Sequence, residues 1–299
     1  MRSFFVAVFI VACLLLAACG RDKGASVLPE SSSSIEVSSS SFFKTSSNST
    51  VVDSLGICEA CDSFNAAAPL ITNSGGRGSV TTYGSISAKE TSQGGACNYG
   101  ETRIQYYAAI HVNISQGDNL GPWQGGLACG GCVAVKVKTP DGWKSTVVRI
   151  TDKCPDENCG VDLGGAPTFD LMGERVGRYE GEWEFVPCAG IESVFGDSTA
   201  IYVKEGASPF WSIIQIRNPP DALKAIEMKR LSDSVLFVIK MASEAENYWK
   251  IPTTILEDSS LYELSVFYRF GQKETWLLKG SALTSEKATL YLQKQTGIL

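Results

Sequence analysis

The chain has 299 residues, of which 26 are Lys or Arg and 32 are Asp or Glu, and its net charge of −6 leaves no basic excess for a nucleic-acid partner. A single histidine, His111, excludes any site that needs several imidazoles. Hydrophobic residues make up 44%, enough for sizeable cores, and the length favours two domains over one. We expect no metal or organic cofactor, and we expect His111 to be a buried structural residue because its neighbours in 107–112 are mostly apolar.

The N-terminus has the pattern of an export signal. Arg2 precedes an apolar run over 4–18, which at 15 residues is shorter than the ~20 that a membrane-spanning helix needs. The run ends Leu16-Ala17-Ala18-Cys19, which resembles the lipobox of bacterial lipoproteins, where cleavage before the cysteine accompanies lipidation of its sulfur. We predict a lipoprotein signal peptide over 1–18 and an exported protein held at a membrane by a lipid on Cys19. An ordinary signal with an incidental cysteine is the alternative.

Residues 19–75 form a predicted tether. Serines cluster at 31–34 and 38–41, and further Ser and Thr continue to about residue 54. Such a segment cannot bury enough apolar surface to offset the entropy of ordering it. We therefore expect a disordered linker between the membrane and the folded domains.

The mature chain keeps eight cysteines besides Cys19, and an even number in an exported protein predicts disulfides. Zinc is the rival, because two pairs have the Cys-x-x-Cys spacing of metal ligands. The separation between these pairs far exceeds the ~15–20 residues of a zinc ribbon, which favours disulfides. All eight precede residue 189, and this change in composition supports a domain boundary near 200. The eight are Cys58, Cys61, Cys97, Cys129, Cys132, Cys154, Cys159 and Cys188.

Short strands dominate the segment 76–200. Val133, Val135 and Val137 alternate with other residues, and a Pro-Asp-Gly turn at 140–142 leads into a second β-rich run over 143–150, which predicts a hairpin. Pairs of glycines punctuate the rest, and only 169–176 has the pattern of a short helix. These features favour a compact β-barrel tied by disulfides.

The segment 201–299 has β-rich runs at a spacing typical of an antiparallel sandwich. It contains no cysteine. The predicted strands are 210–217, 225–231, 235–241, 262–270, 275–279 and 288–292.

Asp152 is the main candidate for chemistry. It ends a strand beside a loop that a Cys154–Cys159 bridge would stiffen, and a general acid needs such a held position and a tunable pKa. The alternative is that Asp152 only caps the turn before Pro155. Glycoside hydrolysis ordinarily uses two carboxylates on opposite sides of the bond. Asp162 follows too closely on the same loop to face Asp152, and 78–88 holds no carboxylate.

Five segments together resemble the expansins, specifically the bacterial expansin-like proteins, over residues 76 to 299. They are 94–100 (GGACNYG), 128–135 (ACGGCVAV), 151–155 (TDKCP), 161–163 (VDL) and 203–208 (VKEGAS). The resemblance implies an all-β protein: a six-stranded double-psi β-barrel at 76–200, followed by an immunoglobulin-like β-sandwich at 201–299 that binds carbohydrate.

The resemblance also implies site residues. The essential aspartate of the family falls on Asp152, its partner on Asp162, and the threonine of its first strand on Thr81, all engaging glycan without hydrolysis. The implied bridges, by analogy with plant members, are Cys97–Cys129, Cys132–Cys188 and Cys154–Cys159, with Cys58–Cys61 as an addition of this chain.

Two positions depart from the family pattern. Cys154 stands where well-known bacterial members carry a tyrosine, so one aromatic of the barrel is missing. On the second domain the family's three coplanar aromatics fall on Phe210, Trp211 and Glu246, so one of the three rings is lost. Trp249 or Tyr248 would compensate if the strand end were shifted, and Lys204 is a further candidate for carbohydrate binding.

Phe210 and Trp211 also have a structural interpretation. Adjacent residues of a regular strand point to opposite faces, so both rings lie on one surface only at a bulge or in a loop. The pattern alone assigns one of the two to the core. Exposed aromatics, by contrast, suit the apolar face of a sugar ring.

We predict a monomeric, non-hydrolytic protein that binds cellulose and other plant cell-wall polysaccharides and disrupts their non-covalent contacts. The absence of an opposed carboxylate argues against an enzyme. Two alternatives remain: a lytic transglycosylase on peptidoglycan, of the rare lipoprotein A type, and a surface adhesin for plant fibre.

Overall fold

The computed structural model describes residues 70–84, 90–113, 121–173, 177–191, 198–252, 254 and 256–292. The predicted signal peptide, the lipidation site Cys19, the pair Cys58 and Cys61, and most of the predicted tether lie outside these residues. Within the described ranges, no helix combines the length and the apolar character needed to span a bilayer.

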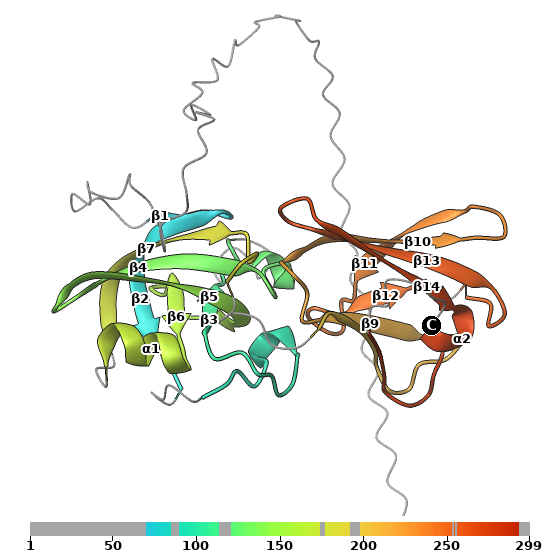
Figure 1. Cartoon of the computed structure of the whole chain (residues 1–299), viewed down its shortest axis with the longest axis horizontal. Helices are drawn as coiled ribbons and strands as arrows, with labels where there is room; N and C mark the ends of the chain where they lie inside the picture. Colours follow the sequence, from blue (N-terminus) through green and yellow to red (C-terminus); the bar gives the residue numbers. More distant parts are fainter. Residues whose placement is uncertain are drawn as a thin grey trace, which may run out of the picture. The chain divides into compact units, whose positions relative to one another are not determined.

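Six strands close into a barrel (Figure 1). Their order is β2-β6-β3-β5-β4-β7, and β7 pairs back onto β2. The β2–β6 and β3–β5 pairs are parallel, and the other pairs are antiparallel. The predicted six-stranded double-psi barrel is therefore confirmed. The strands are β2 (Gly75–Thr82), β3 (Tyr107–His111), β4 (Cys132–Thr139), β5 (Gly142–Cys154), β6 (Val161–Leu163) and β7 (Arg178–Val186).

The predicted hairpin is β4 and β5, with Val133 paired to Val148 and Thr139 to Gly142. The three alternating valines of β4 are fully buried in the barrel core, as period-2 alternation requires. Leu70–Ile71, which we assigned to the tether, instead form the short edge strand β1 paired with β2. Two apolar residues there extend the sheet by one short strand.

The barrel helix α1 spans Gly165–Met172, so the predicted range 169–176 was shifted toward the C-terminus. Pro167 lies in the first turn, where a missing N–H has no helical partner to lose, so it does not prevent the helix from starting early. The helix ends at Gly173, whose N–H donates the last helical bond to the carbonyl of Phe169 and whose positive φ (65°) turns the chain out of the helix. Two 3₁₀ turns complete the barrel, η2 (Gly95–Cys97) and η3 (Gln124–Gly126).

The second sheet has eight antiparallel strands in the order β14-β13-β10-β11-β12-β9-β8-β15. β11 pairs with β10 over most of its length and with β12 through its last two residues, so the sheet curls around one core. The predicted sandwich is confirmed, although β8 and β12 were missed because they have only four and three residues. The strands are β8 (Ala200–Val203), β9 (Ser212–Arg217), β10 (Leu223–Arg230), β11 (Leu236–Met241), β12 (Trp249–Ile251), β13 (Leu261–Tyr268), β14 (Lys273–Lys279) and β15 (Thr289–Leu292), with a short helix α2 (Gly280–Leu283).

Three disulfides cross-link the barrel, and they are the three that the resemblance implied. Their Cα–Cα distances are 5.6, 5.2 and 6.4 Å. Cys129 and Cys132 pair with different partners, so they are not a zinc-binding pair. The bridges are Cys97–Cys129, Cys132–Cys188 and Cys154–Cys159.

Candidate functional site

Four residues from four strands form one row on the barrel, which we call the aspartate row. Thr81 on β2 is paired with Asp162 on β6, Asp162 with Ala109 on β3, and Ala109 with Asp152 on β5. Paired residues of neighbouring strands project to the same face, and strands lie about 4.8 Å apart. The backbones of the two aspartates are therefore about 10 Å apart, with only the methyl group of Ala109 between them in the row.

Asp152 is held by backbone donors. Its Oδ1 accepts the N–H of Ala96 at 2.7 Å and the N–H of Lys153 at 2.8 Å. Within the described residues no hydrogen bond is found to Oδ2. A Cβ on Gly95 would lie 2.3 Å from Cγ of Asp152, and the φ of Gly95 is +42°. The glycine motif at 94–95 thus has a physical role: it lets turn η2 approach this carboxylate closely.

Turn η2 is in turn anchored by the second sheet. The carbonyl of Cys97 accepts two buried side-chain amides, from Gln215 at 3.0 Å and from Asn247 at 2.8 Å. The side chain of Asn98 donates to the carbonyl of Glu246 at 3.1 Å. The turn that supplies the Ala96 N–H to Asp152 is consequently fixed from both sides.

Asp162 and Thr81 are joined by a short hydrogen bond. The Thr81 hydroxyl donates to Oδ1 of Asp162 at 2.6 Å. Burial raises the pKa of Asp162 above its usual value, and the Thr81 hydrogen bond opposes that rise. A half-buried carboxyl group bound in this way suits a supporting role beside Asp152.

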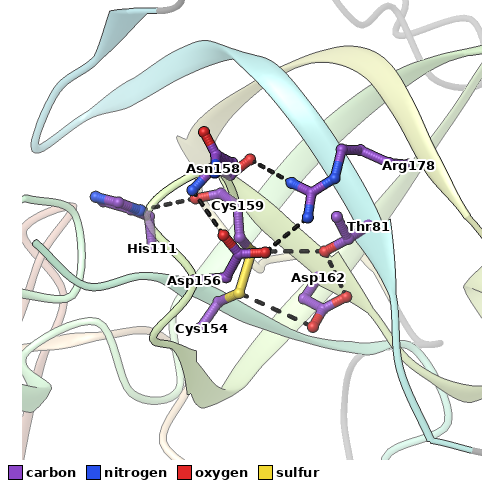
Figure 2. A network of polar contacts seen from close by, with 8 residues as sticks. All are labelled: Thr81, His111, Cys154, Asp156, Asn158, Cys159, Asp162 and Arg178. Atoms are coloured by element: carbon purple, nitrogen blue, oxygen red, sulfur yellow. Dashed lines mark hydrogen bonds and ion pairs between the residues drawn. A yellow bond between two sulfur atoms is a disulfide. The ribbon is translucent and has the colours of Figure 1, made fainter. Parts of the chain in front are cut away.

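The loop between the aspartates is tied to the barrel wall. Figure 2 shows Arg178 of β7 reaching this loop, where it donates to Asp156 at 2.7 Å and to the carbonyl of Asn158 at 2.8 Å. Arg178 also holds the pKa of Asp156 below its usual value. The disulfide sulfur of Cys154 lies 3.9 Å from Oδ2 of Asp162. Because its partner Cys159 is bonded to it, neither sulfur is a free thiolate for a metal.

His111 is buried, and its Nδ1 lies 2.7 Å from the carbonyl of Cys159, as Figure 2 shows. This contact fits the predicted structural role. It helps to hold the loop that ends at Cys159.

Tyr83 is a candidate that sequence reasoning missed. It packs against Ala109 and the Cys154–Cys159 bridge, and its ring meets that of Tyr107 edge-to-face at 5.9 Å. Burial, followed by the charge of Asp152, raises the pKa of Tyr83 far above its usual value. Position 83 lies two residues after Thr81, the spacing that puts side chains on one strand face, so this residue was detectable from alternation.

Glu90 is a second missed candidate. Its carboxylate is hydrogen-bonded by the hydroxyl of Tyr107, and it also acts electrostatically on Tyr83. The prediction that 78–88 holds no carboxylate is true of the sequence, yet Glu90 follows two residues later. Nothing in the local sequence indicated that it would lie near the two tyrosines.

The second sheet presents Phe210 to solvent, with 87% of the residue exposed. Phe210 lies in a turn closed by mutual backbone bonds between Ser208 and Trp211, before β9 begins. Trp211 is only partly buried, packs with Ile213 and Tyr248, and donates its indole N–H to Glu244 at 3.4 Å. Phe210 therefore lies in a turn and not inside a regular strand, so the rule that neighbouring side chains point to opposite faces does not apply to this pair. Neither ring is a core residue.

Three other sequence candidates on the second sheet are placed differently. Trp249 is 4% exposed in the main core, and Tyr248 is 7% exposed. Trp249 was therefore a wrong candidate for a stacking residue, because its strand β12 directs the ring inward. Lys204 is partly exposed, donates to Glu205 at 2.8 Å and lies 5.8 Å from the Tyr248 ring centre.

Glu246, at the position of the third family aromatic, is turned to the barrel. Its Oε1 accepts Nζ of Lys153 at 2.6 Å, and both side chains are about one-third exposed. Lys153 also lies 6.0 Å from the ring centre of the buried Trp123. Glu246 thus forms a contact between the second sheet and the strand that carries Asp152.

No protein-family model matches the sequence, and no curated protein matches it. Among solved structures, the chain is similar to the crystal structure of ligand-free expansin from Clavibacter michiganensis, with 19% identity and a TM-score of 0.52. It is also similar to a mutant of that expansin in complex with cellohexaose, with 19% identity and a TM-score of 0.50. Each comparison covers 73% of this chain and 96% of the other. The barrel-plus-sandwich fold implied by the sequence resemblance is therefore an expansin-like fold.

Proposed function

We propose that the protein binds cellulose and matrix polysaccharides of plant cell walls and loosens their non-covalent contacts without cutting the chains. The observation that carries this proposal is the aspartate row, in which both carboxylates already accept protein hydrogen bonds. The similarity to an expansin whose mutant was crystallised with cellohexaose supports the glycan class.

The geometry of the aspartate row suits binding better than cleavage. Hydrolysis places an acid and a second carboxylate across the scissile bond, with water or the sugar between them. Asp162 is instead engaged by Thr81 and lies against the disulfide on the same barrel row. We assign Asp152 to hydrogen bonding with sugar hydroxyls through Oδ2, and Asp162 and Thr81 to shaping that contact.

Phe210 supplies the second part of the proposed binding surface. An aromatic ring laid against the apolar face of a sugar removes water from both. Its turn holds the ring outside the strand, where a polymer surface can reach it. We propose that Trp211 contributes the exposed part of its ring to the same surface.

The test measures weakening of cellulose paper or wall strips together with new reducing ends. Wild-type protein should weaken the material without new ends, and Asp152→Asn should abolish the weakening. Glu90→Gln is the second variant, because Glu90 is a further carboxylate near Tyr83 and Tyr107 and its loss tests a hydrolytic role. Reducing ends that disappear in either variant would show a glycosidase instead.

Asp152→Asn and Phe210→Ala separate the other two functions. Anhydro-muropeptides released from peptidoglycan, and lost in Asp152→Asn, would show a lytic transglycosylase. Binding to plant fibre without weakening, retained in Asp152→Asn and lost in Phe210→Ala, would show an adhesin. For the proposed function, Phe210→Ala should lower cellulose affinity about tenfold, equivalent to about 1.4 kcal/mol.

The proposed location is the cell envelope, through a lipid on Cys19. Metabolic labelling with a radioactive fatty acid should mark the wild-type chain and not Cys19→Ser. Equal labelling of the two would overturn the anchor and leave the glycan proposal untouched.

A further inference from the structure

An open depression of about 620 Å³ lies on the second sheet beside the proposed aromatic surface. Its lining includes Phe210 and Trp211 together with Val238, Lys240, Lys250 and Pro252. Val238 is 63% exposed and adds apolar surface to this lining beside Phe210. The aromatic surface therefore continues onto β11 and β12, away from Glu246.

Two lysines face each other directly in this depression. Lys240 on β11 and Lys250 on β12 are paired in register, and both are exposed. Side chains paired in this way start about 5 Å apart at Cβ, and like charges there are destabilising. Each of these two ammonium groups is therefore more favourable when a carboxylate lies beside it.

Among the described residues, an ion pair neutralises only Lys250. Lys250 is bonded to Glu244 at 2.8 Å, and this contact lowers the pKa of Glu244 to about 2, so Glu244 is ionised at neutral pH. Glu244 also accepts the indole N–H of Trp211 at 3.4 Å, which ties it to the aromatic side. Lys240 has no ion pair among the described residues, so one positive charge remains free beside Phe210.

We infer that this depression binds a wall polysaccharide that carries carboxylates, a polyuronate, with a sugar face on Phe210 and a uronate carboxylate at Lys240. The inference rests on the proposed glycan-binding function and names its second ligand class. A purely neutral glucan has no group that uses Lys240. An acidic glycan would gain an ion pair between its carboxylate and Lys240, which otherwise faces the like charge of Lys250.

The test compares the affinity of the full-length protein for polygalacturonate, for fully methyl-esterified polygalacturonate and for cellulose. Lys240→Gln removes the free charge, Lys240→Arg preserves it, and Lys224→Gln is the control because Lys224 is an exposed lysine outside the depression. Lys240→Gln should lower affinity for polygalacturonate about two- to fivefold, the range for an exposed ion pair, and Lys240→Arg should restore it. Affinity for the methyl ester and for cellulose should not change.

Two results would overturn the inference. One is equal wild-type affinity for polygalacturonate and its methyl ester. The other is an equal loss in Lys224→Gln, which would reflect overall charge. Cellulose binding that is absent in the wild type, with the Lys240 effect present, would refute the proposed cellulose function and support this ligand class. Cellulose binding that depends on Phe210, with no effect of Lys240→Gln on polygalacturonate binding, would refute the polyuronate inference and support the proposed cellulose function.

Discussion

The barrel and the second sheet hold their candidate binding residues in opposite ways. On the barrel, Asp152 and Asp162 are partly buried and held by backbone N–H groups and a hydroxyl. On the second sheet, Phe210 and Lys240 project into solvent with little that fixes them. A buried polar site needs its hydrogen-bond partners in place, whereas an exposed surface costs little until it binds.

The two regions also differ in what stabilises them. The three disulfides described lie in the barrel, and the second sheet, with no cysteine after residue 188, depends on an apolar core that includes Trp276, Tyr262 and Tyr268. Both regions bury some polar residues, such as Arg149 and Thr151 in the barrel and Gln215 and Asn247 in the second region. The disulfides are therefore the main difference in what stabilises them.

The largest expected effect concerns this covalent difference. Replacing Cys132 and Cys188 with serine removes a disulfide that joins residues 56 positions apart. Because a disulfide that closes a longer loop restricts the unfolded chain more, the free energy of unfolding should fall by about 4 kcal/mol. The loss should be confined to the barrel. Hydrogen exchange should accelerate in peptides from β4 and stay unchanged in peptides from β13.

The matched variant replaces Cys154 and Cys159, whose separation is only five residues, and should cost about 2 kcal/mol. Equal losses in β4 and β13 would show that the two regions unfold as one unit.

A second prediction concerns the anchor between the regions. Asn247→Asp removes the buried amide that donates to the Cys97 carbonyl, and should cost about 1–3 kcal/mol. Asn218→Asp is the control, because Asn218 has a similar left-handed backbone, φ 47° against 61°, and its side chain makes no such bond among the described residues. Urea unfolding measures both. Similar losses would mean that the left-handed backbone, not the buried bond, is responsible.

A third prediction separates the aspartate row from the exposed surface. Gly95→Ala and Gly100→Ala both place a side chain at positive φ, at about 1 kcal/mol each. Only at Gly95 does the new Cβ meet the Asp152 carboxyl group, whereas Gly100 has open space. Wall weakening should fall at least about tenfold in Gly95→Ala alone, while cellulose binding stays constant. Normal weakening by Gly95→Ala would contradict the assigned role of Asp152.

The smallest expected effect is a pH dependence. Because the pKa of Asp162 is raised in the folded state, the folded chain binds a proton more tightly, and stability falls as pH rises from the ordinary Asp value of about 3.9 through the raised one. Asp162→Asn cannot ionise, so its stability relative to wild type should improve from about pH 3 to about pH 7.

For Asp156→Asn we expect the opposite change in stability with pH. The pKa of Asp156 is lowered by Arg178, so its charged form stabilises the fold above the ordinary value, and the variant should lose stability relative to wild type over the same pH change. Urea midpoints at the two pH values measure both. The same sign in both variants would contradict these assignments.

The candidate Thr81 and the partner role of Asp162 were implied only by the resemblance to expansins. Local patterns in the sequence were enough to predict the β4–β5 hairpin, most strands of the second sheet and the candidate Asp152. Each depends on residues close together in the chain, through alternation, turn residues and short motifs. The segment motifs also carried the likeness to expansins, and with it the disulfide pairing that the structure confirms.

The contacts that define the sites were decided only by the tertiary structure. Thr81 meets Asp162 across 81 residues, Asn247 meets Cys97 across 150, and Glu246 turns to Lys153 across 93. Closure of the barrel and pairing of β12 with its neighbours set these encounters, and they also turned Trp249 inward and placed Glu90 beside Tyr107. Such register depends on the packing of the whole core, which no local window of sequence contains.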